Sequence, residues 1–262
     1  MPHDRVPEPF FRRMCHRRSL PHSRAIEKPI ARARQLQDIV RLHDEFEKQK
    51  ARGSGGQLLS IADTGFAAID FESAGSAPGC TDEPVQVAVV HLDGQDIRRR
   101  LNSYVLPSAS VTWAARKVHG ISDQMLVGAP RLLDLWPGIK EAMQNRWIVA
   151  HGASTEKRFL RIFPFHSFGP WVDTLVLTRA VYPGLASHAL GDMIRALGLD
   201  RDPEIASEGF RWHDAESDAI ASLVLLRHLI TACHLGDSGA EILGRPDLSG
   251  YFSARRERFR TG

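Results

Sequence analysis

The sequence has few of the features that mark a secreted or membrane protein. It has 3 cysteines in 262 residues. Cys15, Cys80 and Cys233 lie far apart, so they form no metal-type pair, and their odd number counts against a disulfide framework. No apolar run approaches the roughly 18–20 residues that span a bilayer, and no apolar signal-like stretch follows the first basic residues. We therefore expect a cytoplasmic protein in a reducing compartment, with no membrane partner.

The charge is small in total but unevenly distributed. The formal net charge is +3, yet residues 1–55 carry 13 Lys and Arg against 7 Asp and Glu, a net +6. Residues 251–262 carry a net +3, which leaves −6 on residues 56–250. An acidic body with basic ends suits a carboxylate site whose polyanionic partner is bound by the basic segments outside that body. Solvated tails would give the same distribution.

The chain divides into one folded domain with two extensions. Its composition, 43% hydrophobic and 25% charged, is ordinary for a globular protein. We predict a basic N-terminal extension over residues 1–57, partly disordered, with a helix near 29–50. A Gly-Ser-Gly-Gly sequence at 53–56 acts as a linker or turn before a domain over residues 58–235. Residues 236–262 are expected to form a C-terminal tail.

Hydrophobic patterns predict strands first and then strands that alternate with helices. The first three predicted strands cover residues 66–71, 85–92 and 97–105, and Asp93-Gly94 is a hairpin-turn signal between the last two. A helical region is expected over 112–144, interrupted at Gly120, Pro130 and Pro137. Later strands are expected at 147–150 and 171–173, and helices at 154–163, 174–180, 188–198 and 214–231. This order predicts an α/β fold, a sheet covered by helices.

Asp70 and Glu72 form the most informative pair in the chain. They end the apolar run that begins at Phe66, and because side chains alternate between the faces of a strand, both carboxylates point to the same side. Two anions on one face repel each other unless a cation lies between them, so the pair indicates a divalent metal ion. Seen alone, such a pair is more often an exposed strand end. Two further acids and a histidine at suitable spacings reverse that expectation.

Glu156 and Asp218 each lie near the start of a predicted helix. The residues that follow them at helical spacing are almost all apolar: Phe159, Leu160 and Phe163 after Glu156, and Ser222, Leu225 and Leu229 after Asp218. Both carboxylates are therefore expected to face the interior, where an acid needs a partner. His213 lies five residues before Asp218 and next to Asp214, a candidate N-cap, so an imidazole is expected on a loop beside that carboxylate.

Four short motifs follow one another along the chain: Asp70-Phe71-Glu72, Val118-His119-Gly120-Ile121-Ser122, Val149-Ala150-His151-Gly152-Ala153-Ser154-Thr155-Glu156 and His213-Asp214-Ala215-Glu216-Ser217-Asp218. In this order they resemble the motifs of the DEDDh exonucleases, a family that includes polymerase proofreading subunits, RNase T and oligoribonuclease. The resemblance covers about residues 64–231, and the histidine five residues before the last acid marks the histidine branch of the family.

The resemblance implies an RNase H-like fold, a five-stranded mixed sheet flanked by helices. It also implies 3′-5′ removal of nucleotides from single-stranded DNA or RNA ends or short oligonucleotides. Two Mg²⁺ or Mn²⁺ ions, held about 4 Å apart, would activate the attacking water and stabilise the leaving oxygen. Asp70 would bridge the two ions, with Glu72, Asp218 and Glu156 as the further acidic positions. His213 would be the general base.

The chain departs from the family pattern at several positions. Glu156 stands where the family has Asp; its side chain is one methylene longer, so direct ligation, ligation through water and no ligation are all open. Gly152 replaces an Asn, and Ser73-Ala74-Gly75 replaces a Thr-Thr-Gly. Phe71 lies either under the terminal nucleotide or in the core. Asp173 is interpreted as a cap or turn residue.

Two alternative functions stay open. In the first, Glu156 has spoiled the metal site, and the protein is a catalytically impaired RNase H-like module that binds nucleic acid. In the second, the protein is a scaffold whose working part is the arm formed by residues 1–55, which is also the candidate site for a protein partner.

Overall fold

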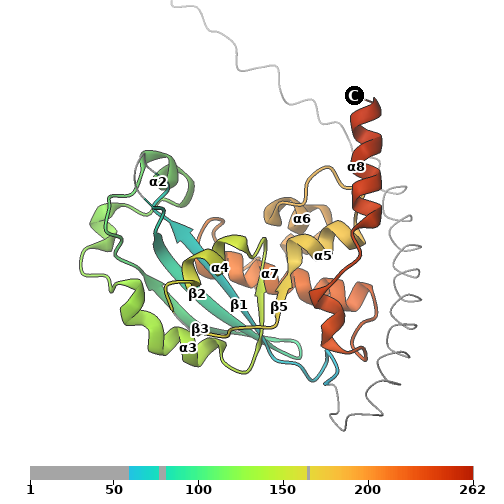
Figure 1. Ribbon diagram of the computed structural model, residues 1–262, viewed down its shortest axis with the longest axis horizontal. Helices are drawn as coiled ribbons and strands as arrows, with labels where there is room; N and C mark the ends of the chain where they lie inside the picture. Colours follow the sequence, from blue (N-terminus) through green and yellow to red (C-terminus); the bar gives the residue numbers. More distant parts are fainter. Residues whose placement is uncertain (1–58, 77–80, 164–165, 262) are drawn as a thin grey trace, which may run out of the picture.

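The computed structural model describes residues 59–76, 81–163 and 166–261 (Figure 1). The predicted N-terminal extension and its helix near 29–50 lie outside the described residues. Within the described ranges, no helix is both long enough and apolar enough to cross a membrane.

A mixed sheet of five strands, in the order β3-β2-β1-β4-β5, lies at the centre of the fold. β1 (Phe66–Ser73), β2 (Pro84–Asp93) and β3 (Asp96–Tyr104) pair antiparallel, and β4 (Trp147–Ala150) and β5 (Trp171–Asp173) continue the sheet in parallel from β1. Gly94, in the turn between β2 and β3, has a φ of 63°, so the predicted hairpin is confirmed. The expected five-stranded mixed sheet is confirmed as well.

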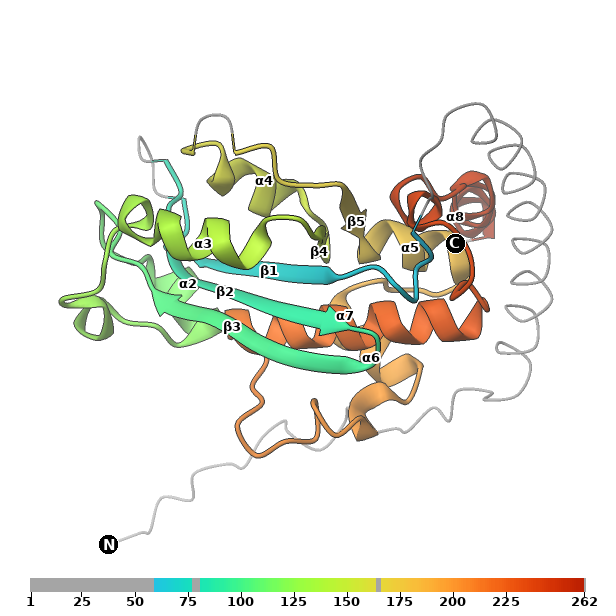
Figure 2. The same cartoon turned by 90° about the horizontal axis from the view of Figure 1, so that it is seen from below.

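Helices cover both faces of this sheet. In the described part of the chain they are α2 (Trp113–His119), α3 (Trp136–Met143), α4 (Ser154–Leu160), α5 (Thr174–Val181), α6 (Leu190–Ala196), α7 (Ala215–Ala232) and α8 (Ser249–Thr261), with 3-10 helices at Asp123–Leu126, Leu132–Leu135, Leu199–Arg201 and Ala240–Gly244. α7 runs along one face, and α3 and α4 lie on the other (Figure 2). The last 3-10 helix and α8 fall in the stretch for which the sequence predicted a tail.

The alternation along β1 decides where its acids point. Phe66 and Ala68 are buried in the core under α7, whereas Ala67, Ile69 and Phe71 are buried in the second core, under α3 and α4. Because successive side chains alternate, Asp70 and Glu72 belong to the α7 face. The strand that carries the two acids therefore directs them towards the longest helix.

Two predicted helix boundaries are wrong for identifiable reasons. α4 ends at Leu160 instead of Phe163. The N–H groups of residues 161–163 donate to the carbonyl groups of residues 158–160, three positions earlier, as in a 3-10 turn. Pro137 does not interrupt a helix. It lies in the first turn of α3, where the missing N–H has no intrahelical partner to lose.

Candidate active site

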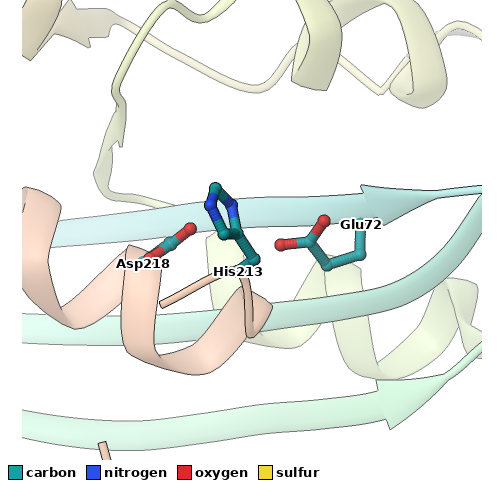
Figure 3. A group of neighbouring side chains, drawn as sticks. All are labelled: Glu72, His213 and Asp218. Carbon is teal, nitrogen blue, oxygen red and sulfur yellow. The ribbon is translucent and has the colours of Figure 1, made fainter. Parts of the chain in front are cut away.

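Three side chains from separate parts of the chain meet at the end of β1. Glu72 comes from β1, His213 from the loop before α7, and Asp218 from the first turn of α7. One ligand atom from each lies within 4.8 Å of the others, and their polar groups point toward one another (Figure 3). The predicted neighbourhood of His213 and Asp218 is therefore confirmed in the structure, and Glu72 faces both.

The loop that carries His213 is held by a buried polar network that starts on β2. Gln86, which is 3% exposed, donates to Asp214 at 2.9 Å and accepts from the Ala215 N–H at 3.2 Å. Asp214 is the N-cap of α7 and accepts from the Ser217 N–H at 3.2 Å. The network fixes the residue next to His213, whose own backbone is left-handed, with a φ of 61°.

Sequence reasoning missed Gln86. The available signal was one polar residue inside an otherwise apolar strand, between Val85 and Val87. A polar group at such a position needs partners in the interior, because a buried group without one is costly. The spacing of the acids does not reveal this residue, which lies opposite Glu72 on the neighbouring strand and binds the loop before α7.

Asp70 and Glu156 join the group through their electrostatics. Burial raises the pKa of Asp70 well above its ordinary value, and the carboxylates of Asp218, Glu156 and Glu72 raise it further, in that order. Glu156 is 5% exposed, and burial raises its pKa to about 7 with a contribution from Asp173. The structure thus groups Glu72, His213 and Asp218 directly, and the charges that act on Asp70 come from Glu72, Asp218 and Glu156.

The remaining two acids are also perturbed. Burial, followed by the charges of Asp218 and Asp214, raises the pKa of Glu72 to about 7. Burial also raises the pKa of Asp218 to about 7; the nearby Asp214 adds to this, and a hydrogen bond with the backbone of His213 opposes it. Several carboxylates that all resist ionisation in one place require neutralisation, by protons or by a cation.

Two buried carboxylate oxygens lack partners. Glu156 Oε2 and Asp218 Oδ1 accept no hydrogen bond from any described residue. Such atoms are costly in a protein interior, and oxygen donors of this kind are the ligands that Mg²⁺ and Mn²⁺ prefer. The residues present therefore fit a divalent cation.

Other predicted residues have structural positions. Asp173 is the N-cap of α5, as interpreted from the sequence, and its carboxylate also accepts from the N–H groups of Gly152 and Ala153. Gly152 has a φ of 87°, a conformation that suits glycine. Phe71 is 6% exposed, and its ring centroid lies 5.3 Å from that of Phe159. The sequence left two positions for Phe71, under the terminal nucleotide or in the core, and the structure supports the core.

A mixed sheet with acids from its central strand facing a helical acid and a histidine is typical of RNase H-like nucleases. Within this class the family is defined by sequence: residues 67–226, more than half of the chain, match the exonuclease family that is named after RNase T. The chain belongs to this exonuclease family, and its four motifs are of the DEDDh type. Exonucleases of this type use divalent metal ions.

Several curated proteins are similar to the chain. It is 28% identical over 174 residues to the PolC-type DNA polymerase III of Thermotoga maritima, a match that covers 64% of this chain and 12% of that protein. It is 26% identical over 171 residues to the 3′-5′ exonuclease DinG of Bacillus subtilis (63% and 17%) and 28% identical over 187 residues to exodeoxyribonuclease 10 of Escherichia coli (71% and 78%). The chain thus spans only a small part of the length of the PolC-type polymerase and of DinG.

Solved structures share the fold. Exonuclease X in complex with 5′-overhanging duplex DNA superposes with a TM-score of 0.56 at 24% identity, over 68% of this chain and 99% of that one. The nuclease domain of 3′hExo, a DEDDh family member bound to rAMP, gives a TM-score of 0.54 at 18% identity, over 68% and 97%. These two likenesses confirm the RNase H-like fold.

Proposed function

We propose that the protein is a metal-dependent 3′-5′ exonuclease that hydrolyses phosphodiester bonds at the 3′ end of single-stranded nucleic acid or short oligonucleotides. The observation that carries the proposal is the convergence of Glu72, His213 and Asp218, together with two buried carboxylate oxygens, on Glu156 and Asp218, that lack partners. The likeness to a relative named as a 3′-5′ exonuclease supports the direction. The proposed exonuclease domain covers residues 58–235, between the extension 1–57 and the tail 236–262.

Four carboxylates are proposed to hold two Mg²⁺ or Mn²⁺ ions: Asp70, Glu72, Asp218 and Glu156. When bound, the ions supply the positive charge that activates the attacking water and stabilises the leaving 3′-oxygen. The unpartnered oxygens of Glu156 and Asp218 support their inclusion. The charges of Asp218, Glu156 and Glu72 all raise the pKa of Asp70, after burial, which supports a position for it among the other three acids.

His213 is proposed to accept the proton of the attacking water. It is exposed, and it lies beside Glu72 and Asp218, so a ring nitrogen reaches both the reaction site and the solvent. A ring nitrogen of histidine is a base of the kind that takes up such a proton. The Gln86–Asp214 network holds the loop and thereby limits the positions that the ring adopts.

A time course on a sequencing gel tests the proposal. DNA and RNA oligonucleotides labelled at the 5′ end are incubated with the full chain and Mg²⁺, Mn²⁺ or EDTA. We expect a ladder that shortens from the 3′ end, absent in EDTA and in Asp70→Ala. Asp96→Ala is the matched control, because it removes an exposed carboxylate from β3, outside the acidic group.

The alternative is a module that binds nucleic acid without cleaving it. It predicts tight binding with no ladder in either metal, and restored cleavage in Glu156→Asp, which brings back the acid that the family has at this position. A ladder from Asp70→Ala equal to that of the wild type would contradict the exonuclease proposal.

A further inference from the structure

Helix α2 is held at the end of β1 by hydrogen bonds and not by the core. None of its seven described residues is buried. At its N-terminus, the Thr112 N–H and hydroxyl both donate to the Ala74 carbonyl, at 2.8 and 3.0 Å. At its C-terminus, His119 Nε2 lies 3.0 Å from the Ser73 carbonyl. Both ends of α2 are therefore attached to the two residues that directly follow Glu72.

The same helix is linked to the candidate active site. His119 binds the Ser73 carbonyl, and Ser73 directly follows Glu72, which lies within the group that contains His213. In the ribbon, α2 lies beside the arrowhead of β1 (Figure 1). α2 thus forms one border of the acidic site.

The surface of α2 carries an exposed aromatic ring among cations. Trp113 is 76% exposed. Lys117, one turn later, places its Nζ 5.0 Å from the centroid of the Trp113 ring, which restricts the orientation of the ring while leaving most of it accessible. Arg116 is also exposed, and the helix contains no acidic residue.

We propose that Trp113, Lys117 and Arg116 form a platform for single-stranded nucleic acid upstream of the nucleotide that is removed. A base stacks on the Trp113 ring, and the two cations bind phosphates. Proteins that bind single strands without reading their sequence combine these two chemistries, aromatic stacking and a cationic track. This inference rests on the proposed function, because it takes the acidic site as the position of the 3′ end.

Charge favours nucleic acid over a protein partner at this surface. The border is cationic, whereas the site beside it gathers Asp70, Glu72, Asp214 and Asp218. A nucleic acid that enters this site brings its phosphates close to the acids and to the metal ions that they are proposed to hold. Cations beside the site offset the repulsion between phosphates and carboxylates. A protein-binding surface has no comparable need for cations beside a group of acids.

Binding measurements with matched variants test the platform. A fluorescently labelled single strand of about ten nucleotides is titrated with the full chain in EDTA, which prevents turnover. We expect Trp113→Ala to weaken binding on the order of tenfold and Trp113→Phe to retain most of the affinity. Lys117→Ala should weaken binding less and reduce the salt dependence by about one phosphate contact. Leu59→Ala is the control: this side chain is 65% exposed, and the next residue, Ser60, pairs with Gly239 and not with α2.

Hydrolysis of the nitrophenyl ester of thymidine monophosphate separates the platform from the acidic site. This probe has no upstream nucleotides, so Trp113→Ala should cleave it as the wild type does while its KM for the oligonucleotide rises. Unchanged oligonucleotide binding in Trp113→Ala, or an equal loss on the ester, would overturn the inference. If the wild type cleaves neither substrate but binds the strand through Trp113, the exonuclease proposal fails and the platform stands.

Discussion

Helices α7 and α2 both border the candidate active site, but they are held in the protein in opposite ways. The inner face of α7 is packed into the core, where Leu223, Leu225 and Leu226 are fully buried. None of the described residues of α2 is buried, and hydrogen bonds at its ends attach it to residues 73–74. The acids therefore lie on elements that the core fixes, and the exposed cations and aromatic ring lie on one that the core does not reach.

This difference matches what the two sets of side chains are proposed to bind. Metal ligands must hold their distances to within about 0.2 Å, so they need supports that do not move. A flexible polymer is bound through stacking and phosphate contacts that tolerate adjustment. The predictions below test this division between a fixed acidic side and an adjustable cationic side.

The largest effect is expected where a charge is removed from α7. Asp218→Asn should lose hydrolysis to the background of the assay, because a proposed metal ligand is gone. The same change should raise the melting temperature of the metal-free protein, since burial and Asp214 already oppose ionisation of this carboxyl group. Activity assays with Mg²⁺ and thermal melts in EDTA measure the two outcomes. A variant that is as active as the wild type would remove α7 from the site.

The next effect compares the packing of the two helices. Leu225→Ala empties a fully buried position on α7 and should lower the free energy of unfolding by about 2–5 kcal/mol. Val118→Ala changes a side chain on α2 that is 55% exposed, and it should alter the free energy of unfolding by no more than about 0.5 kcal/mol. Urea denaturation in EDTA gives both values. Equal losses would mean that α2 is held by packing after all.

The most gradual effect is a pH dependence of the metal-free protein. The pKa values of Glu72, Glu156 and Asp218 are raised to about 7 from ordinary values of 4.5, 4.5 and 3.8. The folded state therefore keeps protons that the unfolded state has already released, and the stability present at low pH is lost as pH rises towards 7. We expect the free energy of unfolding in EDTA to fall by about 1–3 kcal/mol for each of these acids between pH 5 and 8.

Metal ions provide the control for this pH dependence. Saturating Mg²⁺ should reduce the dependence of the free energy of unfolding on pH, because the cation neutralises the acids in place of protons. The binding of Mg²⁺ should weaken as pH falls below about 7. Urea denaturation at a series of pH values, with and without Mg²⁺, measures both. A stability that rises with pH in EDTA would show that these acids are already paired in the metal-free protein.

The sequence predicted the parts of this molecule that have a repeating local pattern. The alternation from Phe66 to Glu72 predicted β1 and the common face of its two acids, and helical spacing predicted the inward positions of Glu156 and Asp218. His213 was found by its distance along the chain from Asp218. In each case the relevant neighbours lie close in the sequence, within about three helical turns or a single strand.

The parts that were missed depend on contacts between distant segments. Gln86 binds residues more than a hundred positions later in the chain, and no local pattern reports such a partner. The early end of α4 follows from a switch to tighter turns at residues 161–163, which the apolar Phe163 does not reveal. Likewise, the spacing between Glu156 and Asp70 says nothing of how close the fold brings them.

The left-handed backbone of His213 has a consequence for how this protein changes over generations. A φ of 61° costs a residue other than glycine about 1 kcal/mol, so glycine at this position would relieve the strain and remove the imidazole. Selection for thermal stability alone would therefore favour loss of the histidine, and only selection for its chemistry would retain it. The identity of this one residue in a lineage is thus a record of whether the lineage has kept the proposed reaction.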